Sequence, residues 1–254
     1  MRRNLKKAMM QGRSLIGTFV FELTEPSIPK ILSTAGFDFI VIDMEHGLHT
    51  IESAARLIAS SHASGLAPLV RIPEITRTHV LRALEAGACG IVAPMIRDRA
   101  DADRLYKLSK YPPTGERGTC LGNAHTEYTI PDARTYMEEQ NEETLLIGQI
   151  ETTESLRNLD VILSSRKIDV AFVGPLDLSV SLGNPGDLGS VEQQNAIERV
   201  LNSCQEHGVL PGSFAPDAES GRALMKRGFR MISCSTELSI FASKSKEMAE
   251  RLRG

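Results

Sequence analysis

Two acidic side chains follow apolar runs in the second half of the sequence. Glu151 comes directly after the run 145–150, and Asp177 comes shortly after the run 169–173. Carboxylates that end neighbouring parallel strands lie close together and offer the oxygen ligands that hard divalent cations prefer. The spacing therefore indicates a metal site. Helix capping by either carboxylate is the alternative from the residues alone.

Two basic residues follow apolar runs in the first half. His46 comes three residues after Asp43, and a histidine near a carboxylate is suited to act as a general base. Structural hydrogen bonding is the alternative for this histidine. Arg71 ends a buried run, where a permanent charge requires an anionic partner. A substrate oxyanion and an internal salt bridge to Asp43 or Glu151 would both meet that requirement.

The lysines are informative by their positions. None of them ends an apolar run, so a buried Schiff-base lysine is not expected. Carbonyl chemistry in this protein would therefore use a metal.

Eight apolar runs alternate with helical patterns along the chain. Runs such as 39–42 and 170–173 are continuously apolar, as parallel strands covered on both faces are. Eight strand–helix units in 254 residues predict a (β/α)8 TIM barrel, which we expect to form one domain over residues 1–254. A doubly wound sheet is the alternative, but the sequence has no glycine-rich phosphate-binding turn. The expected strands are Leu15–Phe21, Asp38–Asp43, Pro68–Ile72, Gly90–Met95, Leu145–Ile150, Asp169–Val173, Val209–Ser213 and Arg230–Cys234.

The composition gives no signature of nucleic-acid or membrane binding. The chain has 29 basic and 32 acidic residues, for a net charge of −3. No apolar run approaches the roughly 18 residues of a membrane span, and no apolar segment of a signal peptide follows the basic start. The four cysteines are far apart, which favours reduced thiols in a cytoplasmic protein.

Two segments have no clear place in the barrel. The stretch Tyr111–Pro131 is long and irregular, and we interpret it as a lid or an interface. The segment Glu237–Arg253 has helical spacing of its apolar residues. It is expected to pack within the chain or against a partner subunit.

Five sequence blocks resemble those of the HpcH/HpaI aldolase family, the metal-dependent pyruvate aldolases. They occur in the same order and at the same spacing, and the resemblance runs from about Gly17 to the C-terminus. The blocks are Phe37–His46, Val70–Pro73, Tyr111–Gly118, Gln149–Thr152 and Val173–Ser179.

This resemblance implies a class II aldolase that reversibly cleaves 4-hydroxy-2-oxo acids to pyruvate and an aldehyde. Glu151 and Asp177 match the family's ligands of a divalent cation, usually Mg²⁺ or Mn²⁺, with Co²⁺ also accepted. Arg71 matches the arginine that stabilises the enolate oxygen. His46 matches the general base, which acts through water.

The resemblance also implies substrate contacts, a partner for the histidine and an assembly. Gln149 and the backbone at Leu176 and Asp177 match positions that hold the pyruvate half of the substrate. Glu85 aligns with an acidic residue that raises the basicity of the histidine, but many members have aspartate there, and Asp43 is a rival. The family is typically hexameric, with the C-terminal helix exchanged between subunits.

Two other functions remain open from the sequence. Related barrels cleave CoA thioesters of the malyl or citramalyl type, but they need a basic groove for the nucleotide phosphates. A metabolite-binding relative without activity would not be expected to keep the complete set of site residues. The acceptor aldehyde is undetermined, and the bulky Phe214 departs from the more familiar members.

Overall fold

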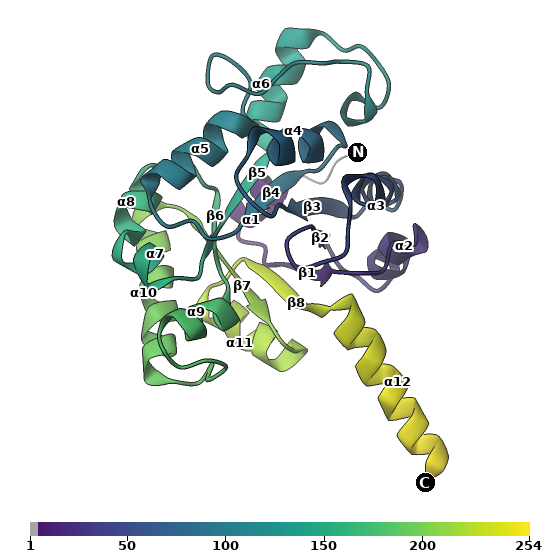
Figure 1. Cartoon of the computed structure of the whole chain (residues 1–254), viewed down its shortest axis with the longest axis vertical. Coiled ribbons are helices and arrows are strands. Elements are labelled where there is room, and N and C mark those ends of the chain that lie inside the picture. Colours follow the sequence, from purple (N-terminus) through teal and green to yellow (C-terminus); the bar gives the residue numbers. More distant parts are fainter. Residues whose placement is uncertain (1–4) are drawn as a thin grey trace.

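Eight parallel strands form a closed barrel in the computed structural model, which describes residues 5–254 (Figure 1). The first four residues of the basic start lie outside this range. The barrel prediction is confirmed, and every strand ends within two residues of its expected boundary. The strands are β1 (Leu15–Val20), β2 (Phe39–Asp43), β3 (Ala67–Arg71), β4 (Gly90–Ala93), β5 (Leu145–Ile150), β6 (Val170–Val173), β7 (Leu210–Ala215) and β8 (Met231–Thr236).

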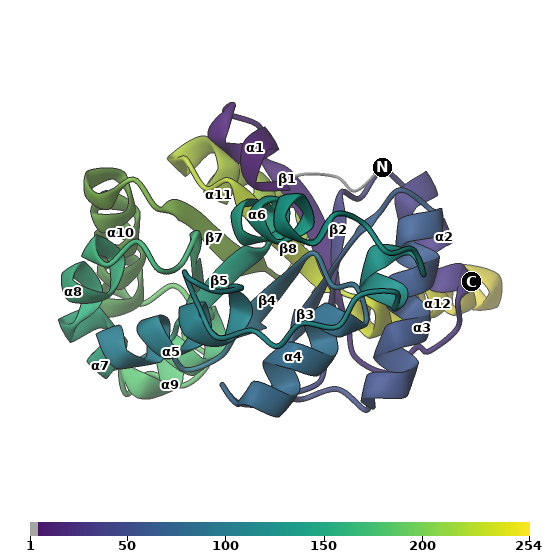
Figure 2. The same ribbon diagram turned by 90° about the horizontal axis from the view of Figure 1, so that it is seen from above.

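Helices surround the strands on the outside of the barrel (Figures 1 and 2). Most begin at a side-chain cap, such as Thr76, whose hydroxyl accepts from the His79 amide. The helices over residues 191–207 and 218–227 end at glycines in the left-handed region, as expected for Gly208 and Gly228. The helices are α1 (Leu5–Met10), α2 (Ser27–Thr34), α3 (Ile51–Ala63), α4 (Arg77–Glu85), α5 (Arg99–Ser109), η1 (Ala124–Thr126), α6 (Ala133–Glu143), α7 (Thr153–Arg157), α8 (Leu159–Ser164), α9 (Pro175–Ser181), α10 (Val191–His207), α11 (Ala218–Arg227) and α12 (Glu237–Arg253).

Strand alternation divides the core into two layers. Along β2, Ile40 and Ile42 pack outward against the helices, whereas Phe39 and Val41 pack in the barrel interior. The next residue of the interior series is Asp43, which is fully buried. On β3, the same alternation makes Arg71 the next interior-facing residue after Leu69. The interior series therefore change from apolar to charged at the carboxyl ends of the strands.

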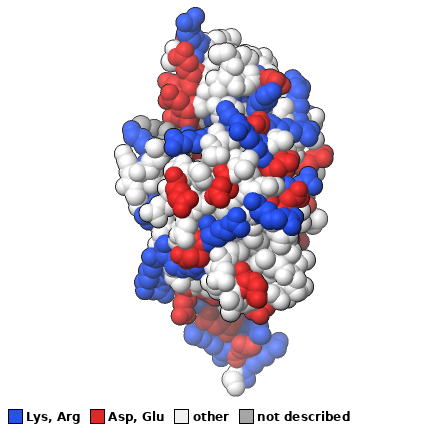
Figure 3. Space-filling view, turned by 90° about the vertical axis from the view of Figure 1, so that its left-hand side faces the viewer, with Lys and Arg blue, Asp and Glu red and all other residues white. Residues whose placement is uncertain are grey.

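The surface carries mixed charge. Basic and acidic side chains are interspersed over the face drawn in Figure 3. Exposed pairs one helical turn apart, such as Arg99 with Asp103 on α5, contribute to this pattern. Within residues 5–254, no helix is both long and apolar enough to cross a membrane.

The two segments without a clear place in the barrel adopt defined structures. The stretch 111–131 leads from the end of α5 towards α6, so it lies at the amino-terminal end of the barrel, away from the charged strand ends. It is therefore not a lid over the charged end of its own barrel. Helix α12 is confirmed as a helix, and it projects away from the barrel (Figure 1).

A buried lysine makes the stability of the fold depend on pH. Lys110 is 3% exposed and donates to the carbonyls of Asn141 and Thr144 at the end of α6, at 2.6 and 2.9 Å. Burial lowers the pKa of its ammonium group to about 8. Between pH 8 and the ordinary pKa of 10.5 the unfolded chain holds more protons than the folded chain, so raising the pH stabilises the fold.

Between pH 7 and pH 9, we expect the free energy of unfolding to rise by about 1 kcal/mol more in the wild type than in a Lys110→Met variant. The variant lacks the ammonium group, so it escapes this titration, although the loss of two hydrogen bonds makes it less stable at both pH values. Urea unfolding of both proteins at the two pH values measures the difference. If the free energy of unfolding changed equally in the wild type and the variant, burial would not lower the pKa of Lys110.

Candidate active site

A buried ion pair joins the ends of β2 and β3. Arg71 donates from Nε to Asp43 Oδ1 at 3.0 Å, and its Nη2 pairs with Oδ2 of the same carboxylate. Asp43 is 0% exposed and Arg71 6% exposed. The two-point contact fixes the plane of the guanidinium group. The internal salt bridge that the sequence left open therefore exists, and it orients Arg71 while the arginine also lines a cavity.

Glu45 connects the arginine to the histidine, a role that sequence reasoning missed. One of its oxygens lies 3.3 Å from Arg71 Nη1 and 3.8 Å from His46 Nε2. Burial raises the pKa of Glu45, and the charges of Arg71 and His46 oppose this effect. Its place between Asp43 and His46 in the sequence was the available signal.

His46 lies in a turn that Asp43 organises. The Asp43 Oδ1 atom accepts from the backbone amides of Glu45 and His46 at 2.9 and 3.3 Å. The imidazole itself is 61% exposed and lines the cavity, so water can reach it. Asp43 thus holds the backbone of the histidine, and the carboxylate nearest to the ring is that of Glu45.

Glu151 is held rigidly at the end of β5. Its Oε1 accepts from the Met95 amide and its Oε2 from Gln149 Nε2, both at 2.8 Å. The side chain is 3% exposed. Burial raises the pKa of Glu151 to about 7, and the nearby charges of Asp177 and Glu45 raise it further. The carboxylate therefore occupies a site with an excess of negative charge.

The structure answers the question of helix capping. Thr152 caps α7, and its hydroxyl accepts from the Ser155 amide at 2.9 Å. Asp177 lies within the first turn of α9, where Gly174 is the capping position and no side chain caps the helix. Neither Glu151 nor Asp177 therefore acts as a cap.

These residues fit a divalent cation. Glu151 and Asp177 supply hard oxygen donors, and Asp177 is close enough for its charge to raise the pKa of Glu151. The buried Oε1 atom of Gln149 has no hydrogen-bond partner among the described residues. A cation would relieve the negative charge, and a ligand beside it would satisfy the amide oxygen. A divalent metal is the cofactor that this donor set suits.

A cavity of about 260 Å³ opens beside these residues at the carboxyl end of the barrel. Its walls carry both the polar groups described above and a set of phenylalanines. Leu176, expected to hold substrate through its backbone, is also in the wall. The lining residues are Phe19, Phe21, His46, Arg71, Gln149, Phe172, Gly174, Pro175, Leu176, Asp177, Phe214 and Thr236.

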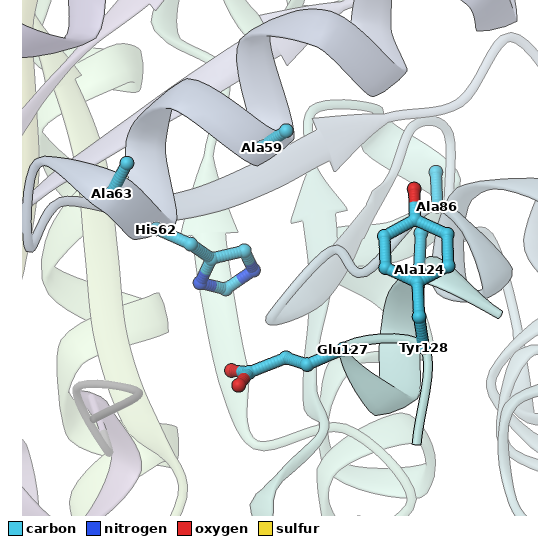
Figure 4. A pocket seen from close by; sticks show the side chains of 7 residues that line it. All are labelled: Ala59, His62, Ala63, Ala86, Ala124, Glu127 and Tyr128. Carbon is cyan, nitrogen blue, oxygen red and sulfur yellow. The ribbon is translucent and has the colours of Figure 1, made fainter. Parts of the chain in front are cut away.

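Another cavity, of about 350 Å³, lies at the outer surface near the end of α3 (Figure 4). Alanine side chains form much of it, and its ionisable side chains are His62, Glu127 and Tyr128. The Nε2 atom of His62 is 2.8 Å from the Gly87 carbonyl. This cavity contains none of the residues expected to bind a metal or a substrate.

Glu85 does not join the site of its own chain. It ends α4, and a helix of the barrel ends at the rim opposite to the carboxyl ends of the strands. There its oxygens lie 3.2 Å from Arg117 Nη2 and 3.1 Å from His125 Nε2. Although burial acts in the opposite direction, these two partners lower the pKa of Glu85. The expected pairing with His46 is therefore absent within the chain.

Gly174 gives a sharp test of the position of the Glu151 carboxylate. A Cβ atom at position 174 would lie 2.2 Å from Glu151 Oε2 and 3.1 Å from its Cβ. We expect Gly174→Ala to displace the carboxylate and lower turnover by about 100-fold, the loss typical of a misplacement near 1 Å.

Gly189→Ala is the matched control, because its new Cβ would meet only Asp187 Oδ1 at an ordinary 3.6 Å. Steady-state kinetics and cation titration of both variants measure the effect. If Gly174→Ala kept wild-type turnover and cation affinity, the carboxylate would not need its present position.

Barrel enzymes carry their active sites at the carboxyl ends of the strands, where this chain places a carboxylate, an arginine and a histidine around one cavity. The family model for HpcH/HpaI aldolase/citrate lyase matches residues 16–243. The chain therefore belongs to this family, whose aldolases are carbon–carbon lyases.

Individual relatives agree with this assignment. The 5-keto-4-deoxy-D-glucarate aldolase of Shigella boydii is 28% identical over 232 residues, which cover 91% of this chain and 89% of the relative. The crystal structure of an HpcH/HpaI aldolase from Desulfitobacterium hafniense superposes with a TM-score of 0.94 at 29% identity, covering 98% and 96% of the two chains. A family protein from Burkholderia cenocepacia gives 0.92 at 29% identity, with coverage of 98% and 99%.

Proposed function

We propose that this protein is a class II pyruvate aldolase that reversibly cleaves 4-hydroxy-2-oxo acids to pyruvate and an aldehyde. The observation that carries the proposal is the composition of one cavity wall. Arg71, Gln149 and Asp177 share it, and Glu151 lies directly against its Gly174. A permanent cation and oxygen donors thus border one space, which can hold a small 2-oxo acid.

The reaction requires stabilisation of a developing negative charge. In the cleavage direction the C4 hydroxyl loses its proton, the C3–C4 bond breaks, and its electron pair forms the enolate of pyruvate as the aldehyde leaves. The enolate then takes a proton at C3. Arg71 donates to the enolate oxygen, and His46 takes up the hydroxyl proton through a water molecule.

Glu151 and Asp177 would hold Mg²⁺ or Mn²⁺, and Co²⁺ would also be accepted. The bound cation supplies positive charge at the oxygens of the 2-oxo acid. Gln149 and the backbone at Leu176 and Asp177 would orient the pyruvate half. Because Asp43 already fixes the guanidinium plane of Arg71, little rearrangement is needed when the charge develops.

We further propose a homohexamer in the cytoplasm in which α12 packs on a partner subunit. Apolar residues remain exposed along this helix, with Phe241 70%, Met248 57% and Leu252 85% exposed. Because Glu85 ends α4 at the far rim, it would reach a His46 only in another subunit. The wide spacing of the cysteines agrees with a reducing compartment.

Release of pyruvate from a panel of 4-hydroxy-2-oxo acids, followed by coupled reduction with lactate dehydrogenase and NADH, tests the reaction. We expect turnover in the presence of Mg²⁺ or Mn²⁺. Absence of pyruvate from every substrate, in a protein that binds the cation, would contradict the proposal. Activity on malyl or citramalyl thioesters would then identify the alternative lyase.

The role of His46 predicts a change in pH dependence. His46→Ala should lower kcat by about 100-fold. This loss is at the lower end of the range for removal of a general base, because water has access to this exposed position. The variant should also have a changed pH–rate profile, because a general base accepts a proton during turnover. His207→Ala, at the end of α10, is the matched control. An unchanged pH–rate profile in His46→Ala would exclude this histidine as the base.

A further inference from the structure

The cavity at the carboxyl end of the barrel has two chemically different halves. Most of the charged and polar side chains of the site come from β2, β3 and β5 or from the turns that follow them, and Asp177 is added from the first turn of α9. The other half is aromatic. Phe19 and Phe21 come from β1 and the residue after it, Phe172 from β6 and Phe214 from β7.

These four phenylalanines, here called the aromatic wall, contact one another around Phe19. The ring centroid of Phe19 lies 5.8 Å from that of Phe21, 6.4 Å from that of Phe172 and 6.2 Å from that of Phe214. Phe19 and Phe172 are buried, at 4% and 2% exposure, and the other two are half-buried. Side chains from three different strands thus form a continuous apolar surface.

The only arginine or lysine in the described cavity lining is already engaged. Arg71 stacks on the Phe19 ring, with Cζ 4.8 Å from the centroid, and pairs with Asp43 and Glu45. A carboxylate at the far end of an acceptor would meet apolar aromatic rings, with no further arginine or lysine in the described lining to pair with it. Burying such an unpaired charge is costly.

We propose that the aromatic wall selects acceptor aldehydes with an apolar body and rejects acceptors that end in a carboxylate, an inference that rests on the proposed aldolase function. The aldehyde carbon points to the charged half, and the remainder of the acceptor packs on the rings. In the addition direction, C3 of the pyruvate enolate forms a bond to the aldehyde carbon. The aldehyde oxygen takes a proton and becomes the C4 hydroxyl.

Two aldehydes of matched shape test this specificity. 4-Methylpentanal and succinic semialdehyde have the same number of non-hydrogen atoms, and an isopropyl group in one replaces the carboxylate in the other. We expect kcat/KM for addition to pyruvate to be about 100-fold higher with 4-methylpentanal, within the range that apolar pockets achieve. Equal values, or a preference for succinic semialdehyde, would overturn the inference.

Substitutions in the aromatic wall test the cause of the preference. Phe214→Arg places a cation in the wall, and we expect the ratio of the two kcat/KM values to shift at least about 10-fold towards succinic semialdehyde. Phe214→Leu keeps an apolar side chain and should keep the preference for 4-methylpentanal. Phe21→Arg repeats the test from the residue after β1 if the first variant does not fold. Ratios unaffected by a folded arginine variant would contradict a role for the wall.

Decarboxylation of oxaloacetate separates failure of this inference from failure of the proposed function. Loss of CO₂ breaks the bond from C3 to the departing carboxylate, and the electron pair forms the same pyruvate enolate without any aldehyde. Decarboxylation together with a preference for succinic semialdehyde would overturn the acceptor specificity alone. Absence of both decarboxylation and aldol addition would overturn the proposed function, and the inference with it.

Discussion

Arg71→Ala is expected to lower aldol cleavage by about 100- to 1000-fold, the loss that follows removal of a preorganised donor at a developing oxyanion. Arg71 is the one permanent cation among the described residues that line the cavity. Its orientation is fixed by Asp43, and its Nη1 edge lies beside Glu45. No second arginine or lysine is present in the described lining to replace its charge.

The same substitution also leaves the fully buried carboxylate of Asp43 without its cation. Removing one partner of a buried pair typically costs about 3–5 kcal/mol of stability. The backbone amides of Glu45 and His46 still donate to Asp43, so we expect the variant to fold with a lower melting temperature.

Arg71→Lys is the informative companion to the alanine variant. It keeps a positive charge but cannot form the two-point contact with Asp43, so we expect intermediate activity. Circular dichroism and urea unfolding establish that each variant is folded before kcat is compared. Turnover near the wild-type rate in a folded Arg71→Ala protein would exclude the assigned role.

Glu151→Gln is expected to remove cation-dependent activity almost completely, by about 1000-fold or more. The substitution keeps the shape of the side chain but removes the charge that would bind the cation. Because the carboxylate lies in a buried and negatively charged environment, a neutral amide should not destabilise the unliganded protein.

Thermal unfolding provides a readout of Glu151 that is independent of catalysis. A cation at 100 times its Kd stabilises a protein by about 2.7 kcal/mol, so Mn²⁺ should raise the melting temperature of the wild type and not that of Glu151→Gln. Glu154→Gln changes an exposed glutamate on neighbouring α7 and is the matched control. An equal shift in all three proteins would place the cation elsewhere.

Residue patterns predicted the barrel because its strands have a strong local signal. The continuous apolar run 39–42 indicates a strand, and a glycine such as Gly208 indicates the end of a helix. Both signals depend on nearby residues alone. The positions of Arg71 and Glu151 followed from the same logic, because a polar residue that ends an apolar run reaches the carboxyl rim of a parallel sheet.

Features that depend on three-dimensional packing were not predicted from the sequence. Phe19 and Phe172 are ordinary core residues by pattern, and only barrel closure brings their rings into contact. Glu85 matched a family position, but the length of α4 places it at the opposite rim, beside Arg117. The role of Glu45 depends on side-chain directions within a turn, which residue type does not specify.

The central claim, that a divalent cation at Glu151 and Asp177 supports cleavage to pyruvate, has one direct test. Pyruvate release from a 4-hydroxy-2-oxo acid is measured before EDTA treatment, after it, and again once Mg²⁺ or Mn²⁺ has been restored. We predict that EDTA reduces release to background and that either cation restores it in the wild type but not in Glu151→Gln. Full release from the EDTA-treated, metal-free protein would contradict this account.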